Sequence, residues 1–281
     1  IQYAIDIAVE GQTILVSQGT YIGQINLNKD NITLASNFLQ SQDENDIELT
    51  KLVNENTLYD YDRIINCDEG LNNITLIGFT IENGDVVDGV NGGALYLENI
   101  NNAVINHCIF NNNQASSTNS QSDKGIGGAI YSENSNLNIS NSQFLNNRAN
   151  YGGAIALGPA HSNIINIDNC IFDSNSTEQN SGADIFSHNS SYLNINIESS
   201  TVSNSSMPIY LDADYTVTNV SNSLFYNVGE ILNARSSSEA TFTNCTLYAN
   251  PNLSTSAGAL SNLGDLTVQN CIFYPYDGIG G

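Results

Sequence analysis

The chain has 281 residues, of which 40% are hydrophobic and only 12% are charged, so it is long enough to bury a core. It carries 6 Lys and Arg against 29 Asp and Glu, a formal net charge of −23 at neutral pH. Such a surface repels nucleic acids and anionic membranes, which excludes nucleic-acid binding, and the sequence has no apolar run long enough to span a membrane.

The first residues predict a short amphipathic helix. Within residues 1–10, apolar side chains recur at helical spacing, and the pattern ends before Gly11. The segments "TILVSQGTY", "GQINLN" and "NITLAS" then read as short strands. Because a repeat fold exposes apolar core and unpaired strand groups at its first unit, we expect this helix to cap that end.

Acidic residues gather in an insertion that we place at residues 39–63, where the phrases "DENDIE" and "YDYDR" occur. Further on, "GDVVDGVN" places Asp85, Asp88 and Asn91 in a glycine-bounded loop. Carboxylate and amide oxygens in a turn suit Ca²⁺, so these three residues form a candidate calcium site, although their spacing is not that of an EF-hand. The alternative is a set of solvated acidic turn residues.

Residues 64–281 contain an irregular internal repeat. Large apolar residues form one column, at Phe110, Phe144, Phe172, Val202, Phe225, Leu247 and Phe273. Small residues stand two positions earlier, at Cys108, Ser142, Cys170, Ser200, Ser223, Cys245 and Cys271. In most repeats the residue directly before the small one is Asn. A second column is Gly-Ala, often preceded by another Gly, as at Gly128-Ala129 and Gly153-Ala154.

Short apolar strands without amphipathic helices between them predict an all-β solenoid. In a parallel β-helix the members of each column would stack about 4.8 Å apart, with the large side chains inside and the asparagines at the corners. We therefore expect residues 1–281 to form one β-helix domain, as a piece of a longer protein.

The opening "IQYAIDIAVEGQTILVSQGTYIGQINLNKDNITLAS" resembles right-handed parallel β-helix proteins of the pectin-lyase-like superfamily. "NITLIGFTIENG", the Gly-Gly-Ala phrases and "NCIFDSN" resemble large extracellular β-helix proteins of bacteria, some of them anchored at the outer membrane, and the passenger repeats of chlamydial polymorphic membrane proteins. The resemblance implies a right-handed β-helix and an extracellular or outer-surface location. Since the matching residues are scaffold residues, it implies little about activity.

Catalytic residues of the superfamily are hard to find in this sequence. Lyases of this fold use a Lys or Arg base beside a cation, and Lys124 and Arg148, on successive coils, come closest; the alternative is that both are solvated turn residues. The Asn-Thr-Asp, Asp-Asp and Gly-His-Gly phrases of galacturonase-type hydrolases do not occur. His107, His161 and His188 are interpreted as turn or stacking residues.

Of the five cysteines, four occupy one column and are interpreted as small interior residues that exchange with Ser there. Cys245 and Cys271 would lie in adjacent coils, close enough for a disulfide, which is the alternative. After them, "YPYDGIGG" has no amphipathic helix to cover the last coil. We expect the chain either to continue beyond Gly281 or to associate end to end through this edge.

Two functions are compatible with these observations. The first is a non-catalytic extracellular module that acts in adhesion, surface assembly or glycan binding. Its partners would be polysaccharides or other cell-surface molecules, and its cofactor, if it has one, would be Ca²⁺. The second is a polysaccharide lyase or another carbohydrate-active enzyme of the same superfamily.

Overall fold

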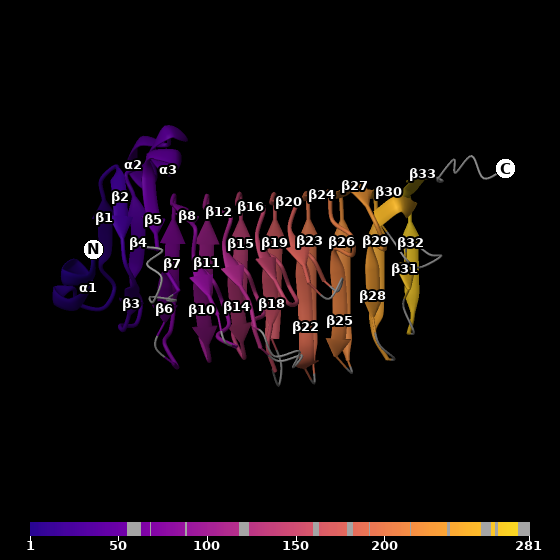
Figure 1. Cartoon of the computed structure of the whole chain (residues 1–281), viewed down its shortest axis with the longest axis horizontal. Coiled ribbons are helices and arrows are strands. Elements are labelled where there is room, and N and C mark those ends of the chain that lie inside the picture. Colours follow the sequence, from indigo (N-terminus) through magenta and orange to yellow (C-terminus); the bar gives the residue numbers. More distant parts are fainter. Residues whose placement is uncertain are drawn as a thin grey trace.

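The computed structural model describes residues 1–54, 63–67, 69–87, 89–117, 124–159, 163–178, 182–190, 192–213, 215–234, 237–253, 260–261 and 264–274. These residues form a parallel β-helix, and the strands of successive coils stand side by side along the long axis of the molecule (Figure 1). The coils form three long sheets, which we call sheets A, B and C in the order in which the chain passes through them. Every described coil contributes one strand to sheet A and one to sheet B, and every described coil but the last contributes one to sheet C. The predicted all-β architecture is confirmed.

The bounds of the strands follow the coils. Sheet A contains β1 (Thr13–Val16), β4 (Thr33–Ser36), β7 (Ile74–Ile77), β11 (Ala103–Asn106), β15 (Leu137–Ser140), β19 (Asn163–Asp168), β23 (Leu193–Glu198), β26 (Thr216–Ser221), β29 (Glu239–Thr243) and β32 (Leu266–Gln269). Sheet B contains β2 (Gly19–Ile22), β5 (Thr50–Val53), β8 (Thr80–Glu82), β12 (Ile109–Asn111), β16 (Gln143–Leu145), β20 (Ile171–Asp173), β24 (Thr201–Ser203), β27 (Leu224–Val228), β30 (Thr246–Ala249) and β33 (Ile272–Tyr274).

Sheet C contains β3 (Ile25–Leu27), β6 (Ile65–Cys67), β10 (Leu95–Glu98), β14 (Ile130–Glu133), β18 (Ile155–Leu157), β22 (Ile185–Ser190), β25 (Ile209–Ala213), β28 (Leu232–Ala234) and β31 (Leu260–Ser261). A small sheet D lies between B and C and contains β9 (Asp85–Val86), β13 (Gln114–Ala115), β17 (Arg148–Ala149) and β21 (Ser176–Thr177). The helices are α1 (Gln2–Ile7), α2 (Phe38–Ser41) and α3 (Asn45–Leu49), with a short 3₁₀ turn at Pro251–Leu253. None of the helices in the described part of the chain has the length and apolarity needed to cross a bilayer.

The predicted column of large residues fills the interior of the β-helix. The rings of Phe110, Phe144 and Phe172 are fully buried and nearly parallel, with centroids 5.0 and 4.8 Å apart along the axis. Strands β12, β16 and β20 pair in register, so each ring lies directly over the one in the previous coil. In β33, the last strand of sheet B, the column member Phe273 is 47% exposed. The interior column is therefore less buried at this end of the described residues.

The corner between sheets A and B needs a residue with positive φ. Asn141, Asn169 and Asn222 take φ values of 50–52° there, and His107 takes 51°. Asparagine tolerates this left-handed conformation, and its side chain bonds along the axis: Asn169 Nδ2 donates to Asn141 Oδ1 at 2.7 Å. The asparagine column is thus explained by backbone geometry.

The Gly-Gly-Ala phrase lies where sheet D leads into sheet C. Gly127 has φ +73°, and a Cβ on Gly128 would lie 2.2 Å from the carbonyl oxygen of Gly153 in the next coil. The backbones of adjacent coils touch at this point, so any side chain would force them apart. The repeated phrase is structural, as the sequence predicts.

The predicted N-terminal cap is α1, which buries Ile5 against the first coil. The side chain of Gln2 pairs with the backbone of Asn26 in β3, accepting from its N–H at 2.8 Å and donating to its carbonyl at 3.1 Å. Lys29 Nζ donates to the carbonyls of Ile5 at 2.8 Å, Ala8 at 2.7 Å and Asp6. The helix therefore covers both the open core and part of the strand edge.

The predicted insertion at 39–63 is partly regular. Residues 50–53 form β5, which belongs to sheet B, so the excursion from the coil is made by α2 and α3. Phe38 of α2 packs on the ring of His107 with centroids 4.6 Å apart. Residues 55–62, which include most of the phrase "YDYDR", lie outside the described residues.

Cys108, Cys170 and Cys245 are free thiols and are buried in the interior column, as predicted. Cys245 and Cys271 do lie in adjacent coils, but the backbone N–H of Cys245 donates to Cys271 Sγ at 3.4 Å and no disulfide joins them.

Candidate ligand-binding groove

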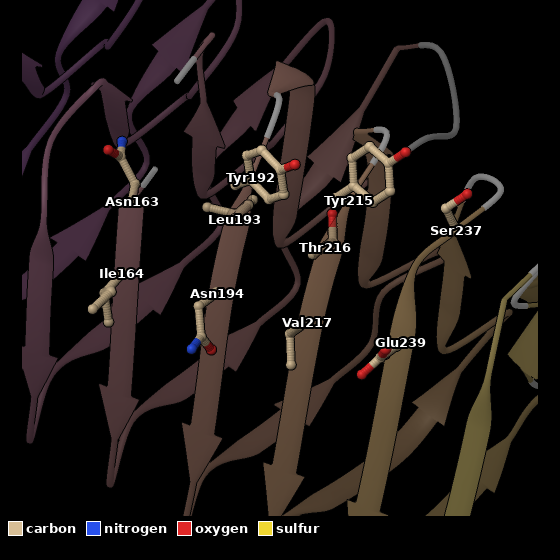
Figure 2. Close-up of a pocket in the computed structure, with 10 residues that line it drawn as sticks. All are labelled: Asn163, Ile164, Tyr192, Leu193, Asn194, Tyr215, Thr216, Val217, Ser237 and Glu239. Atoms are coloured by element: carbon tan, nitrogen blue, oxygen red, sulfur yellow. The ribbon is translucent and has the colours of Figure 1, made fainter. Parts of the chain in front are cut away.

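A hollow of about 380 Å³ lies on the outer face of sheet A, where β19, β23, β26 and β29 cross it (Figure 2). We call it the tyrosine groove. It is lined by Asn163, Ile164, Tyr192, Leu193, Asn194, Tyr215, Thr216, Val217, Ser237 and Glu239. Ligand sites are usually concave, apolar for the most part, and supplied with a few polar groups, and this hollow has those properties.

Two tyrosines form the upper wall of the groove. Tyr192 and Tyr215 each directly precede a strand, and because Leu193 pairs with Thr216 the two rings are held side by side on adjacent coils. The ring centroids are 5.3 Å apart, the ring planes differ by 16°, and the two residues are 59% and 52% exposed. Figure 2 shows both rings with their faces turned toward the viewer. The pair offers an open aromatic platform rather than a packed core contact.

The floor of the groove follows from the alternation of strand residues. Ile164, Asn194, Val217 and Glu239 occupy one register position on four neighbouring strands and point outward, while the residues between them are buried. Asn194 Oδ1 is buried, and none of the described residues donates a hydrogen bond to it. The floor is therefore apolar where Ile164 and Val217 lie and polar where Asn194 and Glu239 lie.

An asparagine ladder runs beside the floor, two residues further along each strand. Asn166 donates to Asn138 at 2.7 Å, Asn196 donates to Asn166 at 2.9 Å, and Asn219 donates to Asn196 at 3.0 Å, in each case from Nδ2 to Oδ1. This row points outward on the same face of sheet A. The groove is thus bordered by a straight line of neutral amides parallel to the axis of the β-helix.

A second aromatic row, on sheet C, is less available. Tyr96 donates its hydroxyl to Glu98 Oε2 at 2.8 Å, and Tyr131, which is 4% exposed, donates to Glu133 Oε2 at 2.6 Å. Burial, and then the bond to the neighbouring glutamate, raises the pKa of each phenol. These hydroxyls are already engaged, whereas the Tyr192 and Tyr215 rings are open.

The predicted lyase pair lies at another corner of the molecule. Arg148 is in β17 of sheet D, and its Nη2 lies 3.2 Å from Glu178 Oε1 in an exposed ion pair. The side chain of Lys124 lies against Gly89 on the preceding coil, where a Cβ would come within 2.6 Å of Lys124 Cδ. The two cations are on successive coils, as predicted, and neither lines the tyrosine groove.

Two of the three predicted calcium ligands are described, and Asp88 lies outside the described residues. Burial raises the pKa of Asp85, and within the described part of the chain no group donates to its Oδ1. Asn91 Oδ1 already accepts from the backbone N–H of Ile126 at 3.2 Å. Ca²⁺ needs six to eight oxygens, and no group of three or more His, Cys, Asp or Glu side chains is placed to hold a metal among the residues described. The calcium site stays a prediction.

Sequence reasoning missed the tyrosine groove. The signal is present in "SYLNINIE" and "DYTVTNVS", in which a tyrosine precedes the same strand of two successive coils. To use it, one must know the register of sheet A, because only the register places the two rings side by side.

The comparisons with known proteins establish the fold. No protein-family model and no curated protein matches the chain. Among solved structures, the chain is similar to endo-xylogalacturonan hydrolase from Aspergillus tubingensis, with a TM-score of 0.58 and 10% identity over 98% of this chain and 88% of that one. It is also similar to pectin methylesterase from Yersinia enterocolitica, with a TM-score of 0.51 and 12% identity over 99% of this chain and 92% of that one. The chain thus has the pectin-lyase-like fold, a right-handed parallel β-helix.

Proposed function

We propose that this chain is a non-catalytic, carbohydrate-binding module of an extracellular or cell-surface protein, and that the tyrosine groove is its binding site. The observation that carries the proposal is the exposed, nearly parallel pair formed by Tyr192 and Tyr215. The C–H face of a sugar ring is apolar and slightly positive, so it packs well on the negative face of an aromatic ring, while its hydroxyls bond to amides and carboxylates at the edge.

The polar groups around the rings fit such a ligand. Asn194 places a side-chain amide in the floor, and Glu239 places a carboxylate at its far end. Glu239 is the sole carboxylate among the described lining residues, whereas glycoside hydrolysis uses a pair of them. The similar solved structures are an endo-xylogalacturonan hydrolase and a pectin methylesterase, which adds support for a carbohydrate ligand and none for a particular reaction.

The proposal is tested by affinity electrophoresis of the whole chain through gels that contain neutral or acidic polysaccharides. We expect at least one polysaccharide to retard the chain, and the double variant Tyr192→Ala/Tyr215→Ala to abolish the retardation. The matched control is Tyr226→Ala/Tyr248→Ala, which removes a tyrosine pair on sheet B with the same 5.3 Å centroid distance and exposures of 55% and 39%. Equal loss in both double variants would show that exposed tyrosines adsorb the polymer without a groove.

The non-catalytic part of the proposal has its own test. Each polysaccharide is incubated with the chain, and both the reducing ends and the ultraviolet absorbance of unsaturated products are followed. We expect no release above the buffer control. Turnover that disappears in a Lys124→Ala/Arg148→Ala variant would instead support the polysaccharide lyase.

A further inference from the structure

We infer that the tyrosine groove takes a neutral, extended hexopyranose chain that lies along the axis of the β-helix, and that it rejects polyuronates. This inference rests on the proposed function and specifies its ligand. Three features of the groove carry it: the direction of its floor, the neutral ladder beside it and the sign of its charge.

The floor runs along the axis. Its four outward positions, Ile164, Asn194, Val217 and Glu239, come from successive coils, and parallel strands are about 4.8 Å apart. The two tyrosine centroids repeat at 5.3 Å in the same direction. An extended chain of hexopyranose units advances by a comparable step for each sugar. A linear polysaccharide that lies along this axis would therefore place about one sugar unit over each coil.

The ladder beside the floor supplies neutral hydrogen-bonding groups at the same interval. A side-chain amide has two N–H donors, and the ladder that joins Asn138, Asn166, Asn196 and Asn219 uses one donor of each amide that donates in it. The other donor, and the second lone pair of each oxygen, can serve ligand hydroxyls. Because these amides carry no charge, the row can bond to ligand hydroxyls but adds no charge attraction for a carboxylate.

The charges on this face are negative. Glu239 lies in the floor, and Asp168 and Glu198 are exposed at the ends of β19 and β23 on the same side of the sheet. Among the described residues that line the groove, none is a Lys or Arg. A polyuronate places one carboxylate on every sugar, so each step along the groove would bring like charges together. Neutral polymers avoid this repulsion.

The direct test compares two probes of equal length, cellohexaose and hexagalacturonate, by isothermal titration calorimetry at low salt. We expect cellohexaose to bind at least about tenfold more tightly than the acidic probe, and the gap to narrow at high salt because screening weakens the repulsion. We also expect affinity to rise from cellobiose to cellotetraose, since the floor crosses four strands. Tighter binding of hexagalacturonate, or no gain with length, would overturn the inference.

Three variants test the contribution of charge to the choice of ligand. Glu239→Gln should raise the affinity for hexagalacturonate several-fold, while Glu10→Gln, which changes the net charge equally at an exposed position near the N-terminus, should not. Arg235 lies outside the described residues, two positions before Ser237, so Arg235→Gln is included. The affinity of the Arg235→Gln variant for cellohexaose should stay within about twofold of the wild-type affinity. An acidic probe that binds through Arg235, and loses binding in that variant, would contradict the inference.

Failure of the inference and failure of the proposed function give different results. If the groove binds a polyuronate and the Tyr192→Ala/Tyr215→Ala variant loses that binding, the binding site holds and the inferred ligand class is wrong. If the two tyrosines are not needed for the binding of either probe or of any polysaccharide in the gels, the proposed function itself fails.

Discussion

The side-chain amide of Asn175 donates a hydrogen bond of 2.8 Å to the carboxylate of Asp184, inside the β-helix. Asn113, Asn147 and Asn175 form a buried ladder in which each amide donates to the next at 3.0 Å. The following coil has Ser205 at this position, and its side chain has no amide oxygen. Asp184, which stands where earlier coils have Ala, provides the acceptor that ends the ladder.

This arrangement predicts a pH-dependent stability. Burial raises the pKa of Asp184 from its usual 3.8 to about 7. Between these values the folded chain holds a proton that the unfolded chain has released, so this group's contribution is complete below pH 4 and is lost as the pH rises to 7. The loss is about 1.4 kcal/mol per pH unit within that window.

The measurement is urea unfolding of the wild type and of Asp184→Asn from pH 4 to pH 8. Asn keeps an oxygen for Asn175 but does not titrate, so the variant should gain stability relative to the wild type as the pH rises, and the difference should level off above pH 7. A difference in the free energy of unfolding that is independent of pH would contradict this prediction.

The aromatic column makes a second prediction. Phe172→Ala removes a fully buried ring that stacks on Phe144, and it should lower the free energy of unfolding by roughly 3–5 kcal/mol. Phe273→Ala, in the same column but 47% exposed, should cost much less. Chemical denaturation of both variants checks the ranking, and equal costs would mean that the column is not the core.

The cap makes a third prediction. Lys29→Met leaves the last carbonyls of α1 without their charged donor and should cost about 1–3 kcal/mol. Amide exchange should accelerate first in α1 and β3. Lys51→Met, which removes a partly exposed ion pair with Glu82 of 2.8 Å, is the control and should cost less than about 1 kcal/mol.

The calcium site makes a fourth prediction. If Asp85 and the residues after it bind Ca²⁺, millimolar Ca²⁺ should raise the melting temperature modestly, and Asp85→Asn should remove that increase. Differential scanning calorimetry with Ca²⁺ and with a chelator decides this. Identical melting temperatures would eliminate the site.

The scaffold was predictable because its rules are local. An asparagine such as Asn141 recurs where the backbone needs positive φ, and Gly128 recurs where adjacent backbones touch, so each leaves a column in the sequence. Phe144 and its neighbours recur because one buried position must be filled in every coil. Such columns can be read without knowing the fold in three dimensions.

The groove was not predictable in the same way. Tyr192 and Tyr215 occur in only two coils, and their platform depends on the register of strands that are weakly marked in the sequence. Asp184 is visible as a departure from the Ala column, but burial inside the coil is what raises its pKa, and its partner Asn175 comes from another corner of the coil. Features that break the repeat need the structure, because no second copy of them exists to compare.

The central claim, that the tyrosine groove binds carbohydrate, has one direct measurement. The chain contains no tryptophan, so Tyr192→Trp places a single indole in the groove and Tyr226→Trp places one on sheet B as a control. Titration with cellohexaose should shift the emission of the Tyr192→Trp variant to shorter wavelength in a saturable manner, because a sugar ring replaces water on the indole face, and should leave the control unchanged. An emission spectrum of the Tyr192→Trp variant that does not respond to cellohexaose or to any polysaccharide tested would contradict the account.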